Sequence, residues 1–517
     1  MTAWLRRLRP AAVLATALAL AAGCGSASSG STSTGSAAGA VPADALFYAD
    51  VNLDTQSPAW KQFADVGRRF PGWQQLVDQI ANSVSHGGSS TANVSLDMAP
   101  TTTFKGDIEP WLGGSAAIAV TSVDAASESV HWVGFVASTD DAKAKAAILK
   151  SGSTDDGSYR SYSLFRTQDG TSEAAVGDGA VLLGDEKGTL QDSIDLRDGG
   201  GDSLSANASF TDAMAKLPAD SLLRGWANTE KLSQLAGFAA LGSNGMDNGQ
   251  TQRAAEALGA LDSLSFGAWA SDAGYHLTIR TVVKDGADRS LFSGQASRSP
   301  LMPLVPSDAF AFLAIHGAGA SLEQLDGRAG GATSLQLHQF EQMTGISFTH
   351  DLVPLLSGDS LFYAGPGIPL RAALVLKPAD PDAAAGAMHK LFALVAREAP
   401  SAAVHSLAGG TGESITLDSG FTVTWQRTPG GLIAVGNDNA AGTAPASQLL
   451  SSGAFTSLLH RAEAPSDAAV PFYLDVPGLL RLIPIDADPN LRHLGGIVGW
   501  STHQGNAYSS DLFVEVR

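Results

Sequence analysis

Four segments of the sequence begin with Pro-Ala-Asp or Pro-Ser-Asp and continue into an apolar run. They start at Pro42, Pro218, Pro306 and Pro465. The apolar runs that follow have the composition of strands, at residues 46–51, 222–226, 310–315 and 470–474. Proline fixes the turn and aspartate bonds to the backbone beyond it, so the chain begins each strand at a defined angle. This pattern predicts architecture and carries no chemistry.

A longer pattern divides the chain into two repeats. The stretch DIEPWLGG at residues 107–114 returns as DLVPLLSG at residues 351–358, with Asp, Pro, Leu and the final Gly in register. Six matching features recur in the same order in both halves, which indicates an internal duplication. We expect repeat 1 over residues 41–284, a join over residues 285–304 and repeat 2 over residues 305–517.

The local patterns are those of mixed helices and strands. Leu277, Ile279 and Thr281 alternate with polar residues, as in a half-buried strand. Asp380-Pro381 is a favourable helix start, followed by an apolar stripe that reaches Val395. Short Gly or Asp turns between apolar runs indicate antiparallel hairpins. The predicted fold class is therefore α+β, with two homologous repeats, each an antiparallel sheet with helices packed on one face.

Composition narrows the classes of partner. The chain has 517 residues, of which 44% are hydrophobic, so it can bury a sizeable core. It has 51 acidic and 32 basic residues, a formal net charge of −19. An acidic surface repels phosphate backbones, and we therefore expect no nucleic-acid partner.

The single cysteine, Cys24, follows a start typical of an export signal. Three arginines precede an apolar stretch at residues 11–22, which is too short to span a bilayer. Leu20-Ala21-Ala22-Gly23-Cys24 resembles the lipobox of bacterial lipoproteins. The resemblance implies a signal peptide over residues 1–23 and a lipid anchor on Cys24, at the extracytoplasmic face of the bacterial cell membrane. The alternative is an ordinary cleaved signal with a chance cysteine.

The segment after the cysteine is almost wholly Gly, Ser, Thr and Ala. Such a composition cannot bury apolar surface, so we expect residues 24–40 to be a flexible tether. An acylated Cys24 leaves no thiol for a disulfide, and stability must come from the core.

Several landmarks together carry a family resemblance. The opening from Val41 to Asp54, the Pro110–Gly113 element and the strand and Asp-started helix after it resemble a bacterial family known as domain of unknown function 3352. The likeness covers nearly all of residues 41–517. It implies an exported or membrane-tethered protein, and it supplies no activity, cofactor or catalytic residue.

One enzymatic pattern needs weighing. Gly358-Asp359-Ser360-Leu361 resembles the nucleophile block of the Gly-Asp-Ser-Leu hydrolases, and residues 201–204 match it too. In that family an Asp-x-x-His supplies the base that a serine hydroxyl requires. None of the eleven histidines has Asp three residues before it. We therefore interpret residue 358 as a turn before a strand and residue 201 as part of a loop.

Metal and phosphate patterns are incomplete. No two histidines have the i, i+4 spacing of a helical metal site; the candidates are His316, His338, His350, His389 and His405. Asp486–Asn490 begins like a calcium loop but continues with Leu491 where glycine is needed. Residues 184–189 have the residue types of a phosphate loop at the wrong spacing. We expect no metal ligand and no cofactor.

The first repeat is rich in aromatic residues, namely Trp60, Phe63, Phe70, Trp73 and Trp111. At helical and strand spacing they are more often core than the lining of a groove.

The sequence predicts an extracytoplasmic lipoprotein of the cell envelope that is not an enzyme and has a binding or scaffolding role. Its ligand or partner protein is unknown. An alternative is a carrier that holds a lipid or acyl chain between sheet and helices. A further alternative is an esterase-like hydrolase that uses Ser360.

Overall fold

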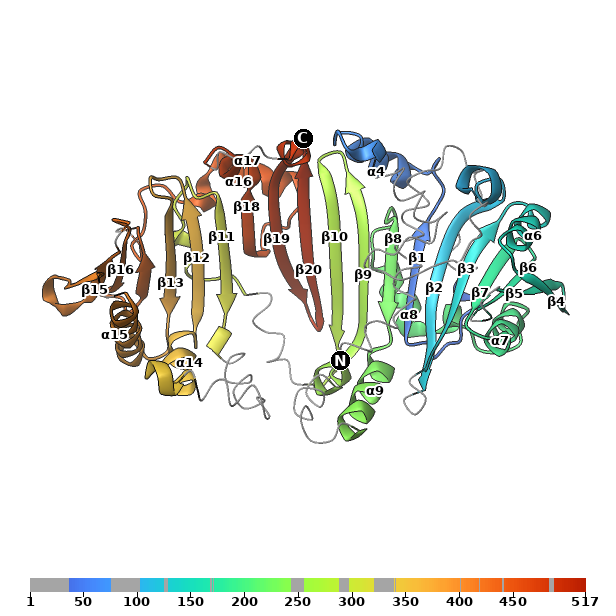
Figure 1. Cartoon of the computed structure of the whole chain (residues 1–517), viewed down its shortest axis with the longest axis horizontal. Coiled ribbons are helices and arrows are strands. Elements are labelled where there is room, and N and C mark those ends of the chain that lie inside the picture. Colours follow the sequence, from blue (N-terminus) through green and yellow to red (C-terminus); the bar gives the residue numbers. More distant parts are fainter. Residues whose placement is uncertain are drawn as a thin grey trace. The chain divides into compact units, whose positions relative to one another are not determined.

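The computed structural model describes most of the chain from residue 37 onward. The described residues are 37–75, 103–124, 129–167, 170, 172–242, 255–287, 297–319, 339, 341–399, 401–417, 419–438, 441–482 and 488–517. They divide into two compact units. Unit 1 comprises the described residues within Met1–Ala239 and Arg253–Ala287 together with Val516, and unit 2 comprises the described residues within Ala240–Gln252 and Asp288–Glu515 together with Arg517. Each unit is α+β and is built on antiparallel strands (Figure 1).

The strands of unit 1 pair in the order β4-β5-β6-β7-β3-β2-β1-β8-β9-β10. All of these pairings are antiparallel. Their bounds are β1 Phe47–Asn52, β2 Leu112–Asp124, β3 Ser129–Ser138, β4 Thr154–Tyr159, β5 Tyr162–Arg166, β6 Glu173–Gly177, β7 Ala180–Gly184, β8 Leu223–Ala227, β9 Leu261–Ser271 and β10 Gly274–Val283. The helices of this unit include α4 Pro58–Gly67, α6 Asp141–Lys150, α7 Lys187–Arg197, α8 Ala208–Ala215 and α9 Thr229–Gly242.

The strands of unit 2 pair in the order β14-β15-β16-β17-β13-β12-β11-β18-β19-β20, which is the order of unit 1 with every number raised by ten. Their bounds are β11 Ala311–His316, β12 Asp359–Gly365, β13 Arg371–Lys377, β14 Ala403–Ser406, β15 Gly412–Thr416, β16 Thr422–Arg427, β17 Ile433–Gly436, β18 Ala469–Asp475, β19 Leu494–Gln504 and β20 Ala507–Val516. Its helices include α14 Val353–Leu355, α15 Pro381–Glu398, α16 Gly453–Arg461 and α17 Val476–Leu480.

The four Pro-x-Asp turns lie where the sequence places them. In each, the amide three residues after the proline donates to the proline carbonyl, at 3.0–3.1 Å. The turns precede β1, β8, β11 and β18. Within each unit the two strands that follow these turns are neighbours, β1 beside β8 and β11 beside β18.

Helices pack on both faces of each sheet, so the prediction of helices on one face is wrong. In unit 1, α7 and α8 contribute to a core with Tyr48, Phe135 and Trp226, whereas α4 and α6 contribute to a second core with Val51 and Val181. Successive strand side chains point to opposite faces, and both sets here are apolar. Two apolar faces each require a covering layer, which one layer of helices cannot supply.

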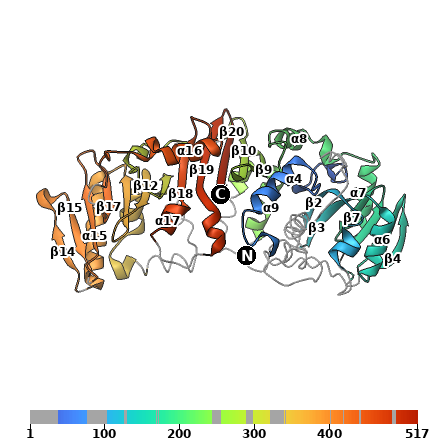
Figure 2. The same ribbon diagram turned by 90° about the horizontal axis from the view of Figure 1, so that it is seen from above.

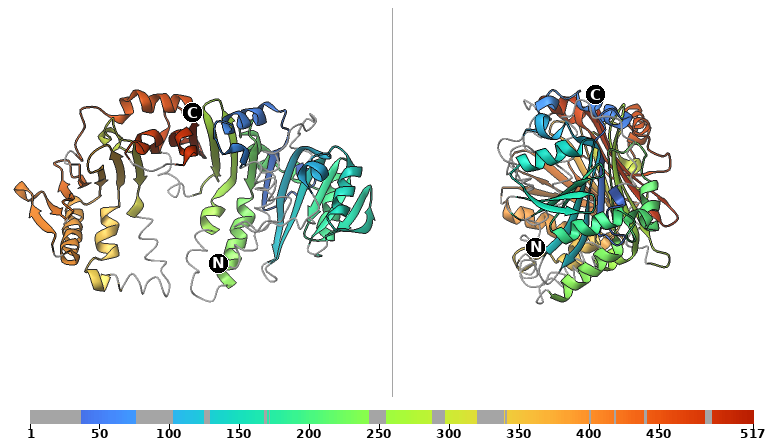
Figure 3. Two further views of the ribbon diagram at one scale, coloured as in Figure 1. Left: turned by 45° about the horizontal axis from the view of Figure 1, so that its top comes forward. Right: turned by 90° about the vertical axis from the view of Figure 1, so that its right-hand side faces the viewer.

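Unit 2 follows the same plan. Helix α15 covers one face through Met388 and Phe392, against Leu376, Trp425 and Ile433 of the sheet. It lies beside β14, β15, β16 and β17 (Figures 2 and 3). The opposite face receives α16, whose Phe455 contacts the rings of Phe312 and Tyr473.

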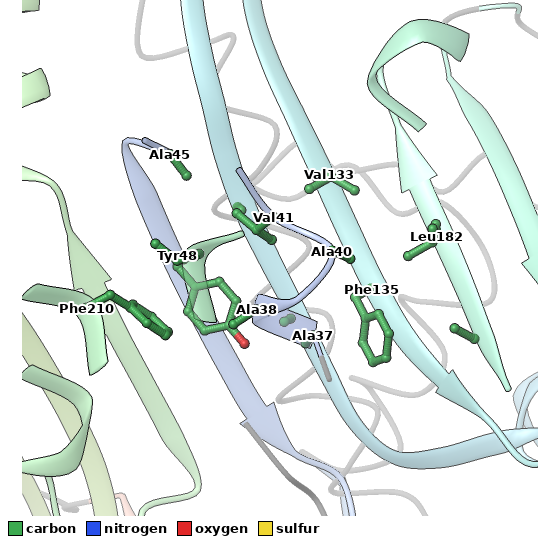
Figure 4. Close-up of a cluster of buried hydrophobic side chains, with 14 of the residues drawn as sticks. Ala37, Ala38, Ala40, Val41, Ala45, Tyr48, Val133, Phe135, Leu182 and Phe210 are labelled. Atoms are coloured by element: carbon green, nitrogen blue, oxygen red, sulfur yellow. The ribbon is translucent and has the colours of Figure 1, made fainter. Parts of the chain in front are cut away.

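The amino-terminal end of the described chain belongs to the core of unit 1. Ala37, Ala38, Ala40 and Val41 are buried and pack with Tyr48 and its neighbours (Figure 4). Backbone hydrogen bonds then join residues 41–43 to residues 202–204. A flexible tether through residue 40 is therefore wrong at its last four residues, because alanine is small and apolar enough to be buried here.

Candidate functional site

Three side chains of unit 1 with metal-ligand chemistry meet at the end of β7. His131 lies on β3, Asp185 directly follows β7, and Glu186 is the N-cap residue of α7. Strand β3 pairs with β7, and the partner of Val133 is Gly184, so the end of β7 lies beside His131. The side-chain ligand atoms of the three residues all lie within 4.8 Å of one another. In the described part of the chain this is the only such group of three or more His, Cys, Asp or Glu residues.

Hydrogen bonds hold two of these side chains in place. Asp185 accepts the backbone amide of Trp132 through Oδ1 at 2.9 Å, and its Oδ2 lies 2.7 Å from His131 Nδ1. Glu186 Oε1 is 3.7 Å from the same imidazole nitrogen. The side chains of His131 and Asp185 are 27% and 20% exposed, whereas that of Glu186 is 59% exposed. The group is therefore fixed on the protein side and open on the solvent side.

The nearest lysine in the sequence does not neutralise this group. Lys187 Nζ lies 2.6 Å from Asp156 Oδ2. Among the described residues, the ion pairs of Asp185 and Glu186 involve only His131. Two carboxylates thus share one imidazole. The amino end of α7 supplies partial positive charge that offsets part of their repulsion.

Unit 2 places different side chains at the corresponding position. Strand β13 pairs with β17, and Asn437 Oδ1 accepts the backbone amide of Ala372 at 2.7 Å, as Asp185 does from Trp132. Arg371 takes the place of His131, and its Nε lies 3.6 Å from Asp438 Oδ2. Asp438 takes the place of Glu186. A permanent cation is therefore built into unit 2 where unit 1 has an imidazole.

Sequence reasoning missed this group because its members are distant in the chain. His131 and Asp185 are separated by 54 residues. By local sequence, residues 184–189 have only the residue types of a phosphate loop at the wrong spacing. The signal that was available is the alignment of Gly184-Asp185 with Gly436-Asn437, which puts a carboxylate where the other half has an amide.

Ser360 lies inside β12 and is buried, and its hydroxyl has no hydrogen-bond partner in the described part of the chain. Its cross-strand neighbours are Ile315 and Leu376. His316 pairs with Asp359 at 2.8 Å, but strand residues alternate, so Asp359 points to the opposite face from Ser360. The described residues give this serine no base.

The two Gly-Asp-Ser-Leu stretches have structural roles. A Cβ on Gly358 would lie 1.9 Å from the carbonyl oxygen of Lys377, so only glycine fits there. In the other stretch, the Asp202 carbonyl accepts the Ala43 amide and the Leu204 amide donates to Val41. This backbone pairing fixes the start of unit 1.

The remaining predicted site residues are apart from one another or outside the described residues. Cys24, the signal peptide, residues 24–36, His338 and Asp486 lie outside them. His389 pairs with Glu413 at 2.8 Å, and His350 Nδ1 lies 3.2 Å from Ser347 Oγ. Asp488 caps the short helix Pro489–His493 by accepting the Asn490 amide at 2.9 Å.

The first-repeat aromatic residues that the structure describes are mostly core. Trp60 and Trp111 are buried in the α4 and α6 core, with Phe63 packed against it. Phe63 also contacts Trp73 and Tyr275. Among the described residues, no helix combines the length and apolar character needed to cross a membrane.

The chain is an α+β protein built on antiparallel sheets. It belongs to the family described as protein of unknown function DUF3352, whose model matches residues 10–486. The comparison with curated proteins gives no match. Among solved structures, the chain is similar to crystal form IV of TP0453, with a TM-score of 0.26, 7% identity and coverage of 47% of this chain and 79% of that one. For crystal form I of TP0453 the values are 0.27, 9%, 51% and 88%.

Proposed function

We propose that the protein is an extracytoplasmic lipoprotein, anchored through Cys24, with a non-catalytic binding or scaffolding role at the bacterial cell envelope. The lipobox-like residues before Cys24 support the anchor. Two acyl chains suffice for stable attachment to a membrane, whereas one is marginal. The partner is a protein or an apolar ligand of the envelope.

We also propose that the two units are homologous repeats. Their strand orders agree throughout, and their cores share a three-ring motif. Phe210 packs edge-on against Tyr48 and Trp226 in unit 1, as Phe455 does against Phe312 and Tyr473 in unit 2. Independent folds rarely agree in both topology and packing, so descent from one ancestor accounts for the agreement.

A second shared motif supports the duplication. A single π-helical turn precedes β2 at Phe104–Ile108 and β12 at Phe348–Leu352. In each, an aspartate accepts the backbone amide of the residue that precedes the turn and pairs with a lysine from a later helix, α6 in unit 1 and α15 in unit 2. Lys150 bonds Asp107 and Lys390 bonds Asp351, both at 2.7 Å.

The two units share a scaffold but have different side chains at the ends of β7 and β17, and this difference supports the binding role. Both units keep the rings and the aspartate–lysine pair, yet differ where β7 and β17 end. Function usually resides in particular side chains placed on a shared fold, and different side chains at the end of one equivalent strand are typical of that arrangement.

Under this proposal the connection between the anchor and unit 1 is short. Ala37, Ala38, Ala40 and Val41 are buried in the core, so residues 25–36 connect Cys24 to unit 1. A flexible chain of that length has a root-mean-square span of about 20 Å. The proposal therefore holds unit 1 close to the membrane surface.

The carrier alternative has one observation in its favour. Leu313, Ile315 and Phe362 on β11 and β12 are each more than 40% exposed, and Leu313 faces Phe362 across the strands. Under α15, by contrast, Met388 and Phe392 fill the layer between helix and sheet. A carrier would therefore hold its ligand on the open β11–β12 face. Solvent extraction of purified protein and mass spectrometry of the extract test this, with lipid at one equivalent expected.

The anchor is tested by expressing the full gene with Cys24 intact and with Cys24→Ser. We expect the native protein in the membrane and detergent phases, carrying the mass of the acylated mature chain. The Cys24→Ser protein should appear in the aqueous phase. Equal partitioning of both proteins, or a native chain with its leader intact, contradicts the anchor. Cross-linking on intact cells then tests the binding role, and recovery of the protein alone in repeated experiments argues against it.

A further inference from the structure

We propose that His131, Asp185 and Glu186 of unit 1 bind one divalent transition-metal ion of the Zn²⁺ class. The inference does not depend on the lipid anchor. It rests on the geometry of the three side chains, on their charge and on the contrast with unit 2.

The two distances from His131 to the carboxylates lie below and above the ligand spacing of a tetrahedral site. His131 Nδ1 lies 2.7 Å from Asp185 Oδ2 and 3.7 Å from Glu186 Oε1. Zinc–nitrogen and zinc–oxygen bonds of about 2.0–2.1 Å place tetrahedral ligands about 3.3 Å apart. The observed distances lie on either side of that value. A rotation of the exposed Glu186 side chain and a small opening of the His–Asp pair would complete the geometry.

The charge of the group calls for a divalent cation. In unit 2, the guanidinium of Arg371 pairs with two carboxylates, those of Asp308 and Asp438, and Asn437 is neutral. In unit 1 the corresponding residues are an imidazole and two carboxylates. With the imidazole neutral, the formal charge is minus one in unit 2 and minus two in unit 1. One divalent ion neutralises the group in unit 1.

Unit 2 also shows that this place in the fold accepts a cation. The guanidinium of Arg371 lies beside the residues that follow β17, and β17 pairs with β13 there as β7 pairs with β3 in unit 1. The position is therefore compatible with concentrated positive charge in a folded unit. In unit 1, Lys187 bonds Asp156, and the described ion pairs leave the carboxylates to His131.

The ligand types select the metal. Imidazole with carboxylates suits Zn²⁺ and related transition metals, whereas Mg²⁺ and Ca²⁺ prefer oxygen ligands alone. Three protein ligands leave a fourth position for water or a partner group. The amino end of α7 opposes a cation, so the two carboxylates are needed together.

The test uses the full mature chain with Cys24→Ser, which removes the only thiol. We expect calorimetric titration with ZnCl₂ to give one ion per chain, and CoCl₂ to give the visible absorption of a tetrahedral site. Changing His131→Arg together with Asp185→Asn reproduces the residues of unit 2. This double variant should bind at least about tenfold more weakly while its unfolding temperature is kept.

Two further variants make the result decisive. Glu186→Gln changes an exposed side chain, leaves the fold undisturbed and should also weaken binding by about tenfold. His389→Gln removes a His–carboxylate pair of unit 2 with the same close contact, at 2.8 Å, and should leave binding unchanged. Absence of stoichiometric binding by the native site overturns the proposal, and the contact of His131 with Asp185 is then a hydrogen-bonded pair without a metal. Equal binding by the double variant, or equal loss in His389→Gln, also overturns it. None of these outcomes bears on membrane partitioning through Cys24.

Discussion

The β1–β8 pair of unit 1 and the β11–β18 pair of unit 2 occupy the same place in their sheets but bury different chemistry. Unit 1 has Asp50 opposite Arg224, joined by two hydrogen bonds of 3.1 and 3.2 Å. Unit 2 has Ala314 at the position of Asp50. The three rings that flank this position are present in both units. The fold therefore depends on the rings, and the ion pair is an addition peculiar to unit 1.

The comparison separates what both cores require from what one of them tolerates. A buried ion pair stabilises little beyond a well-packed apolar pair, because desolvation offsets the attraction between the charges. Removing one partner is a different matter, since it leaves a charge buried alone. The following expectations test this distinction, in order of falling effect.

The largest effect is expected from the central ring of either motif. Phe210→Ala and Phe455→Ala each remove a buried ring, and each should lower the free energy of unfolding by about 3–5 kcal/mol. Urea unfolding followed by tryptophan fluorescence measures both. Clearly unequal losses would show that the two motifs do not carry the same share of stability.

Breaking the ion pair should come next. Arg224→Ala leaves Asp50 buried without its partner, and we expect a loss of about 3 kcal/mol, the low end for buried pairs because Arg224 is partly exposed. The double variant Asp50→Ala with Arg224→Leu approaches the apolar state of unit 2 and should recover most of the loss. A double variant as unstable as Arg224→Ala alone would mean that the pair itself stabilises unit 1.

The pH dependence of stability should reveal the same carboxyl. Burial raises the pKa of Asp50, and Arg224 offsets this only in part. A raised pKa in the folded state means that folding favours the protonated carboxyl. The contribution of Asp50 to the free energy of unfolding is therefore present at low pH. It is lost as the pH rises from the unfolded value, about 4, through the folded pKa. Asp50→Asn should abolish that loss in unfolding curves recorded across this range.

The smallest effect concerns the aspartate–lysine pairs. Lys150→Met and Lys390→Met should each cost about 0.5–1 kcal/mol, because both lysines are about half exposed and such pairs are screened. The hydrogen bond from Lys150 lowers the pKa of Asp107. Its stabilisation is thus present above the unfolded pKa and lost as the pH falls through the folded pKa. Lys150→Met should reduce this acid sensitivity, which thermal unfolding at several acidic pH values measures.

Elements set by neighbouring residues were predictable from the sequence. Asp380 caps α15 and Pro381 follows it, as the sequence predicts, and Ser57 and Pro58 begin α4 in the same way. Asp140 likewise caps α6 at Asp141–Lys150. These features depend on hydrogen bonds within a few residues, so a local pattern specifies them. The family was recognisable for the same reason, because its landmarks are local motifs in a fixed order.

Features that depend on distant residues were not predictable. Helices on both faces follow from apolar side chains on both sides of the strands, which the sequence alone did not distinguish from a single covered face. The burial of Ala37 and Ala38 depends on Tyr48 and Phe135, which come from different strands. Alanine occurs both in flexible tethers and in buried cores, so its presence in the sequence does not distinguish the two.

The sequence by itself determined the turns, the caps, the order of the strands along the chain and the family, because each of these is encoded by residues close together. Only the tertiary structure decided which strands are neighbours, and with them that His131 lies beside Asp185 and Glu186. The pairing of β3 with β7 spans about fifty residues and depends on the free energy of burying whole sheet faces. No short sequence motif encodes that free energy of burial.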